Sequence, residues 1–173
     1  MTNKRYDDDR ERADLLETLA EHRAFLRQTV NGLTDEQARK RTTVSELCLG
    51  GVIKHVTLVE AGWADFIVHG PRSMGPADES AADAHAAGFR MSDGDTLAGL
   101  LARYSEVAGR TDDLVASLES LDAAHPLPPA PWFAPGARWT ARRVLLHIIA
   151  ESSQHAGHAD IIRESLDGAK TMG

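Results

Sequence analysis

Two residues near the end of the chain have types and spacing that suit a metal ion. Glu151 and His155 lie four residues apart, so on a helix they would be neighbours on one face, one turn apart. Both continue an apolar repeat that includes Val144 and Ile148, which predicts that they face the interior. A buried carboxylate is costly unless a cation or close donors neutralise it. The pattern therefore predicts a cation beside Glu151.

A third ligand is available in a second helix-forming segment. His55 lies on the same apolar stripe as Val59 and Phe66. Two imidazoles and one carboxylate form the three-ligand set of catalytic zinc sites, which leave one position for water or substrate. The same set suits iron(II). Such an ion lowers the pKa of a bound water and deprotonates a bound thiol, so either ligand could serve as a nucleophile.

Each of these residues also has a simpler interpretation. A single histidine on an apolar face is more often a satisfied core residue than a ligand. An exposed Glu151–His155 pair would be an ordinary contact on a helix surface. The hypothesis of a metal site formed by His55, Glu151 and His155 rests on the coincidence of all three at buried positions of two helices.

Two further histidines extend the row on the last helix. His147 lies four residues before Glu151, and His158 lies three residues after His155. Either could be an outer donor to a ligand or a replacement ligand, because metal-bound side chains usually need an outer partner. For His147, a capped and partly exposed histidine is an equally good interpretation.

Other side chains could belong to the pocket around the site. Arg163 could join His158 there, although a salt link to Asp160 or Glu164 explains it equally well. Glu60 could brace a ligand or face water, and Trp63 follows it on the same predicted helix. No residue is assigned a catalytic role at this stage.

Composition excludes several classes of function. The 173 residues carry a formal net charge of −7, which argues against nucleic acid or an anionic membrane as partner. Cys48 is the only cysteine, so no internal disulfide is expected, and we interpret it as a small buried residue. No Gly-rich phosphate loop, nucleophile elbow or Cys-x-x-Cys pair occurs. Without a leader or an apolar span, a cytoplasmic protein with one domain over residues 1–173 is expected.

Helical periodicity predicts four long helices. The first covers about residues 8–30, and the second runs from near Leu47 to Gly70, where it ends. The third covers about 97–121, and the fourth runs from its N-cap Thr140 to Gly168. A capping box at 34–37 predicts a short connecting helix. Residues 71–94 are expected to form a loop with a helical turn at its Ala-rich centre. The Pro-rich segment 122–139 is expected to be an irregular crossover, because neither helix nor interior strand is plausible there. The fold class is all-α, a four-helix bundle with long second and third connections.

The segments that carry the three candidate ligands resemble a known superfamily. The stretch from Ser45 to His55, followed by Glu60 to Trp63, resembles the second-helix signature of the DinB-like superfamily, in its small actinobacterial branch. The stretches from Arg143 to Glu151 and from His155 to Glu164, ending in Asp167 to Ala169, are similar to the fourth helix of that branch.

This resemblance implies an up-down-down-up bundle with His55, Glu151 and His155 as metal ligands. The commoner superfamily pattern has histidine at the position of Glu151. The glutamate version is similar to the metal site of mycothiol-dependent maleylpyruvate isomerase, and related members are thiol S-transferases that use mycothiol or bacillithiol. That isomerase carries an additional C-terminal domain which is missing here, so its activity is not expected.

The function that the resemblance implies is transfer of a low-molecular-weight thiol, such as mycothiol, to an electrophilic small molecule in detoxification. A metal-bound thiolate would be the nucleophile. Zinc is the expected metal, with nickel or iron as alternatives, and a homodimer is one expected assembly. Two other functions stay open from the residues: a hydrolase that uses metal-bound hydroxide, and a stress-response protein whose metal is structural.

Overall fold

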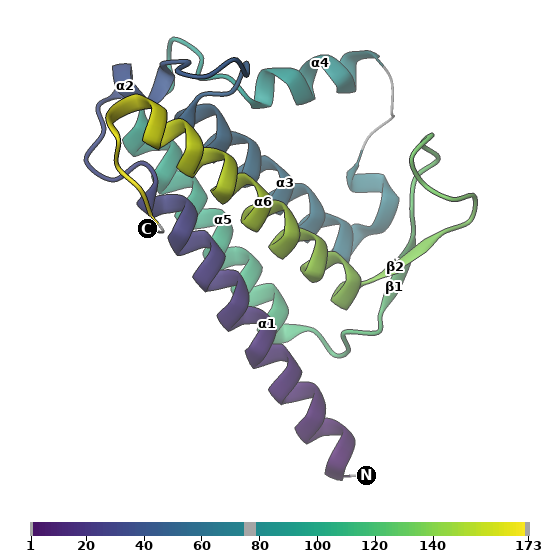
Figure 1. The fold of residues 1–173 in the computed structure, drawn as a ribbon. Coiled ribbons are helices and arrows are strands. Elements are labelled where there is room, and N and C mark those ends of the chain that lie inside the picture. The colour runs from purple at the N-terminus through teal and green to yellow at the C-terminus, as the bar shows by residue number, and fades with distance from the viewer. Residues whose placement is uncertain (1, 75–78, 172–173) are drawn as a thin grey trace.

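Four long α-helices dominate the computed structural model, which describes residues 2–74 and 79–171. They are α1 (Thr2–Gln28), α3 (Leu49–His69), α5 (Leu97–Ser117) and α6 (Ala141–Asp167). Helix α6 contacts both α1 and α3, and α3 also contacts α5. Figure 1 shows α1 and α6 running in one direction and α3 and α5 in the opposite direction. Among the described residues, no helix combines the length and apolar character needed to span a membrane.

Two apolar clusters fill the interior, one toward each end of the long helices. One includes Leu26, Val52 and Tyr104, and the other includes Phe66 and Val144. Buried polar residues lie between the two clusters along each helix; they are Arg23 on α1, Thr57 and Glu60 on α3, Thr111 on α5, and Ser152 and His155 on α6. The buried His55 adjoins this layer, between Ile53 and Val56 of the first cluster. The middle of the helices is therefore the polar layer of the core, and the candidate site lies in it.

The predicted helix ends agree well with the structure. Thr34 and Gln37 form the complete capping box of the short helix α2 (Asp35–Arg39). The Thr140 hydroxyl accepts from Arg143 N at the start of α6, and Gly168 ends that helix with φ of 79°, the left-handed conformation that glycine adopts without steric cost. Helix α1 starts earlier than expected, and α5 ends at Ser117 instead of continuing toward Leu121.

The second connection contains more helix than expected. A 3₁₀ helix, η1 (Gly70–Ser73), follows α3, and α4 (Glu79–Gly88) crosses the end of the long helices in Figure 1. Part of the predicted loop, residues 75–78, lies outside the described residues. The Ala-rich composition of α4 favours helix on propensity alone, although its few apolar side chains gave only a weak periodic signal.

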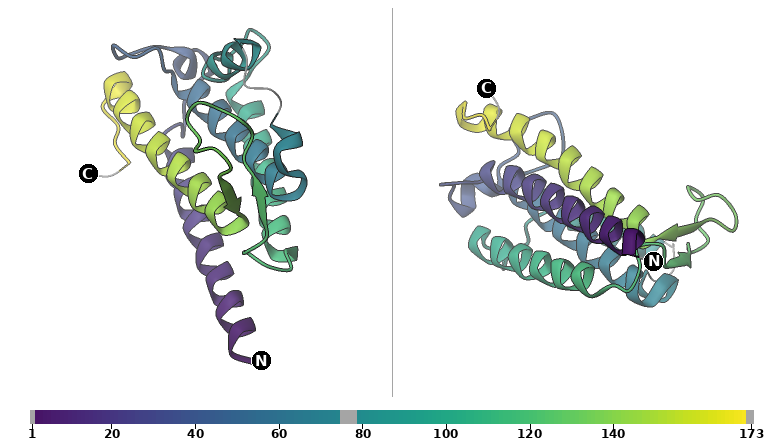
Figure 2. Two further views of the ribbon diagram at one scale, coloured as in Figure 1. Left: turned by 90° about the vertical axis from the view of Figure 1, so that its right-hand side faces the viewer. Right: turned by 90° about the horizontal axis from the view of Figure 1, so that it is seen from below.

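The Pro-rich crossover contains a short hairpin that was not predicted, and neither of its two strands is interior. Strands β1 (Ala124–Pro126) and β2 (Arg138–Thr140) form a short antiparallel hairpin in which His125 pairs with Trp139. Pro126 is tolerated because it is the last residue of its strand. Figure 2 shows the hairpin beside the start of α6, toward the end of the long helices opposite α4.

Candidate metal centre

Side chains from α3 and α6 converge at one point in the polar layer. Ligand atoms of His55, Glu151 and His155 all lie within 4.8 Å of one another, and the group could hold a metal ion. Nε2 of His155 lies 3.5 Å from Oε2 of Glu151, and Nε2 of His55 lies 3.9 Å from the same oxygen. The structure therefore brings together the three residues that the sequence singled out.

Burial differs among the three side chains. His55 and His155 are 5% and 10% exposed, whereas Glu151 is 26% exposed. The expectation of a fully buried carboxylate is thus met only in part: Glu151 stands at the rim of the core and the two imidazoles lie deeper. Because Glu151 is partly exposed, a small molecule from solvent can reach the site from the side of this carboxylate.

The spacing of the three groups fits an ion better than direct hydrogen bonds. Both nitrogen–oxygen distances, 3.5 and 3.9 Å, exceed the usual range for an N–H···O bond. Donors about 2.1 Å from one tetrahedral zinc ion would lie about 3.4 Å apart, close to the separation of His155 and Glu151. Two imidazoles with one carboxylate are also a donor set that zinc accepts.

The surroundings favour the protonation states that metal binding needs. Contacts with His155 and His55 hold the pKa of the Glu151 carboxyl well below its usual range. Burial lowers the pKa of His55, with a smaller opposing effect of Glu151. At neutral pH the carboxylate is therefore ionised and His55 is neutral, as ligands must be.

Two outer histidines contact the candidate ligands from α6. Nδ1 of His158 lies 3.4 Å from Nδ1 of His155, on the ring edge away from Glu151. Nε2 of His147 lies 3.7 Å from Oε1 of Glu151, the oxygen that does not face His55. Both therefore occupy places from which they could orient a ligand.

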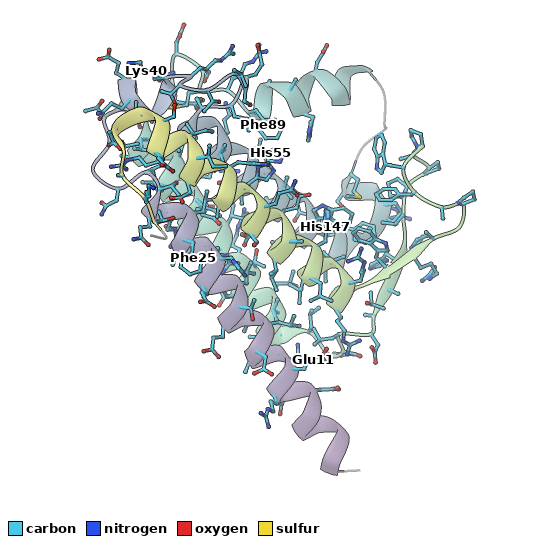
Figure 3. The ribbon with its side chains drawn as sticks, in the orientation of Figure 1. Glu11, Phe25, Lys40, His55, Phe89 and His147 are labelled. Atoms are coloured by element: carbon cyan, nitrogen blue, oxygen red, sulfur yellow. The ribbon has the colours of Figure 1, made fainter. Side chains whose placement is uncertain are left out.

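Phe89 and His85 belong to the surroundings of the site, and neither was predicted. The ring of His55 stacks on Phe89 with centroids 3.7 Å apart, and His85 on α4 meets the His55 ring edge-on at 5.2 Å. Figure 3 shows Phe89 and His55 together beneath α4. A Cβ added at Gly51 would lie 1.9 Å from the carbonyl oxygen of Phe89, so this close approach requires glycine.

The glycine pair at the start of α3 was the available sequence signal for that contact. A Cβ at Gly50 would lie 2.1 Å from Sδ of Met91, so both glycines lie under the segment that follows α4. Glycine is unfavourable inside a helix, and two in succession at a helix start indicate that another chain segment packs there.

Trp63 lies on the other side of the site, toward the hairpin. It stacks on Trp139 of β2 with centroids 4.8 Å apart and planes 17° apart. His147 meets both indole rings edge-on, at 4.9 Å and 5.2 Å. Trp63 thus reaches the candidate ligands through His147, the residue next to Glu151.

Glu60 and Arg163 make contacts elsewhere. Glu60 is fully buried and neither braces a ligand nor faces water; its carboxylate accepts from Arg23 Nη2 at 2.5 Å and Nε at 3.2 Å. Arg163 pairs with Asp167 instead of Asp160 or Glu164. Its Nη1 also donates to the carbonyl oxygens of Thr29 and Asn31, each at 3.0 Å, which ties α6 to the turn after α1. Cys48 is buried before α3.

Comparison with models of known protein families shows which family the chain belongs to. Residues 14–168 match the family described as mycothiol-S-transferase. The chain belongs to the mycothiol S-transferase family. That family is part of the DinB-like metal-binding superfamily, in agreement with the resemblance seen in the sequence. A search of curated proteins found no match.

The match covers every part of the site in this mycothiol S-transferase family member. It spans α3 and α6 with the three candidate ligands, the segment that carries His85 and Phe89, and the hairpin that carries Trp139. A small-molecule substrate and a thiol are therefore the partners that the family implies.

Proposed function

We propose that this protein is a metal-dependent enzyme that transfers mycothiol to an electrophilic small molecule. The observation that carries the proposal is the convergence of His55, Glu151 and His155 on one point, in a chain of the mycothiol S-transferase family. Zinc is the ion we propose, because two imidazoles and one carboxylate form its open, catalytic ligand set.

The chemistry follows from that ligand set. When bound, a divalent ion would lower the pKa of a coordinated thiol so that the sulfur is present as thiolate at neutral pH. In the transfer, the thiol gives up its proton, a new carbon–sulfur bond forms, and the leaving group departs with the electron pair of the bond that breaks. Glu151 keeps its negative charge throughout, and the neutral ring of His55 stays fixed against Phe89.

The remaining elements of the proposal concern the whole chain. Four long helices with two running each way support an up-down-down-up DinB-like bundle, which we propose is formed by residues 1–173 as one domain. We propose a cytoplasmic role in detoxification of electrophiles, with no nucleic acid or membrane as partner. The net charge of −7 supports the exclusion of nucleic acid.

Metal analysis and cobalt substitution test the site. The purified protein should contain about one equivalent of a divalent metal, and the His155→Ala variant should lose it. His69→Ala is the matched control, because His69 is an exposed histidine at the end of α3. Equal metal content in His155→Ala and His69→Ala would exclude the site.

Mycothiol binding tests the reaction. Adding mycothiol to the cobalt-substituted protein should change the visible spectrum, because a sulfur ligand enters the coordination sphere. The Cys48→Ser variant should show the same change, since Cys48 is buried and is not part of the site. An unchanged spectrum in the wild-type protein would contradict the thiol assignment. Electrophiles can then be screened with and without mycothiol, and turnover without thiol would indicate hydrolysis instead.

A further inference from the structure

A row of aromatic rings leads from the candidate metal centre to the surface of the hairpin. The row begins at His147, beside Glu151, and its rings follow one another at centroid distances of 5.2 Å to Trp139, 5.8 Å from there to Phe133, and 6.1 Å to Trp132. Trp132 is 71% exposed. The row therefore connects a histidine that contacts the candidate ligand Glu151 with an exposed indole on the hairpin.

The row is fixed to the rest of the protein. Trp139 stacks on Trp63 of α3, and Nε2 of His125 lies 3.2 Å from the carbonyl oxygen of Ile67, so the hairpin is held to α3 at two places. Leu127 N donates to Ala137 O at 2.9 Å and extends the pairing into the loop that carries Trp132. The rings are therefore presented in a defined arrangement beside the site.

Cationic donors accompany the rings. The guanidinium of Arg143 lies 4.7 Å over the ring of Trp139 and is exposed. Within the described part of the chain, the Arg143 side chain makes no hydrogen bond or salt bridge, although acidic residues outnumber basic ones in this protein of net charge −7. Arg138, also exposed, uses Nη2 to donate to Ala124 O at 2.6 Å. Arginine offers donors and no acceptor, so hydroxyl and carbonyl oxygens are suitable partners for both.

One exposed indole beside half-buried rings, with arginine donors nearby, suits a neutral polyol. The apolar C–H faces of a sugar ring pack on an aromatic ring, and the sugar hydroxyls accept from arginine. Mycothiol has this chemistry: its thiol belongs to an N-acetylcysteinyl group that is joined to a glucosamine–inositol unit. If the sulfur lies at His55, Glu151 and His155, the sugar unit must lie along a surface that leads away from them.

We propose that the row from His147 to Trp132, with Arg143, is the binding surface for the glucosamine–inositol unit of mycothiol. This inference rests on the proposed function. It assigns Trp132 and Arg143 as residues that determine which thiol is accepted, whereas the three candidate ligands would accept any thiol. The hairpin is then the part of the fold that separates mycothiol from smaller thiols.

Comparison of two thiols tests this assignment by direct binding. Zinc-loaded wild-type protein, Trp132→Ala and Arg143→Met are titrated with mycothiol and with N-acetylcysteine, which lacks the sugar unit, using calorimetry. Each substitution should weaken mycothiol binding about 5- to 10-fold and leave N-acetylcysteine binding unchanged. Trp132→Tyr should keep most of the affinity, because it keeps an aromatic face. Ile161→Ala, which truncates another exposed apolar side chain of the protein, is the control and should change neither.

The outcomes separate this inference from the proposed function. If wild-type protein binds neither thiol, the proposed function fails and the sugar surface fails with it. If wild-type protein binds mycothiol and both Trp132→Ala and Arg143→Met bind it equally well, only the sugar surface is overturned. A matching loss for both thiols in these variants would also overturn it, because it would mean that the hairpin acts on the metal centre and not on the sugar.

Discussion

The imidazole of His55 lies flat on the phenyl ring of Phe89, with centroids 3.7 Å apart and planes inclined by 17°. The stack fixes the plane of the imidazole and hence the direction of Nε2, the atom that faces Glu151. Phe89 follows α4, and α3 can accept it so closely only because Gly51 has no side chain. The position of one candidate ligand therefore depends on a glycine four residues before it.

Replacing that glycine should disturb both stability and metal binding. In Gly51→Ala the new methyl group would meet the backbone of Phe89, which cannot yield as a side-chain end can. We expect a loss of about 1–3 kcal/mol in the free energy of unfolding of the metal-free protein, as for other overpacked sites. Urea denaturation measures this loss, and a chelator competition should show weaker zinc binding.

Gly62 in the same helix is the matched control for Gly51. A Cβ at Gly62 would meet nothing within 4 Å, so Gly62→Ala should stabilise the protein by up to about 1 kcal/mol through helix propensity. If the two alanine variants had the same stability, the close packing of Phe89 on α3 would be contradicted.

The sequence predicted the parts of the fold in which apolar residues recur with the period of an α-helix. The apolar repeats predicted the long helices, and the buried positions of His55 and His155 followed from the same repeats. Thr34, Thr140 and Gly168 marked helix ends through local hydrogen bonds and backbone conformation, which depend on a few neighbouring residues only.

Features that depend on contacts between distant segments were missed. Strands of three residues are too short to show alternation, so the hairpin of β1 and β2 was not predicted. No pattern of neighbouring residues links Glu60 on α3 to Arg23 on α1, because the two residues lie 37 positions apart in the sequence. Phe89 was missed for the same reason, since it lies after α4 and its neighbour His55 lies on α3, 34 residues earlier in the chain.

His158 should strengthen metal binding by orienting His155. Its Nδ1 lies 3.4 Å from Nδ1 of His155, where it can accept a hydrogen bond from the Nδ1–H of His155 and so leave Nε2 of His155 unprotonated for an ion. His158→Ala should therefore weaken zinc affinity about 10- to 100-fold, as expected for loss of an outer partner. His158→Gln, which retains an acceptor, should recover part of the loss. Competition with a chromophoric chelator measures both variants.

His69→Ala again provides the control for His158, because it removes an exposed histidine far along α3 from the site. Unfolding curves of the metal-free variants show whether the fold is intact. Unchanged zinc affinity in His158→Ala would mean that His155 needs no support from α6.

Asp95 should give the protein a pH-dependent contribution to stability. Its carboxylate accepts from Lys54 Nζ at 2.8 Å and from the backbone N–H of Ser92 at 2.7 Å, which joins the start of α5 to α3. The bond from Lys54 is the main cause that lowers the pKa of Asp95 to about 2. Because the folded-state pKa is depressed below the unfolded value of 3.8, this stabilisation is present above pH 3.8 and is lost as the pH falls toward about 2.

Carboxyl NMR titration measures the pKa of Asp95 directly. The Asp95 signal should titrate near pH 2 in the wild-type protein and at a higher pH in Lys54→Met. Asp95→Asn should be less stable than wild type at pH 7, and the difference should shrink between pH 3.8 and about 2. A titration of Asp95 near its ordinary pKa would contradict the structural role of the Lys54 contact.

Arg23 and Glu60 form an ion pair inside the polar layer of the core. Glu60 is fully buried and Arg23 is 3% exposed; Arg23 Nη1 also donates to Asp112 at 2.8 Å. Arg23→Met leaves the Glu60 carboxylate buried without its cation, so we expect it to cost about 3–5 kcal/mol of unfolding free energy. Glu60→Gln should cost less, because Arg23 keeps its contact with Asp112.

The double variant Arg23→Met/Glu60→Met tests whether each buried charge is tolerated only because the other charge is present. Removing both charges leaves no buried ion to neutralise, so the double variant should be more stable than Arg23→Met alone, although it removes more polar contacts. The surface pair Lys170–Glu164, with both side chains about half exposed, is the control, and Lys170→Met should change the unfolding free energy by less than about 1 kcal/mol. If the double variant were as unstable as the sum of its single variants, the charges would not depend on each other, and burial of Glu60 would need a different explanation.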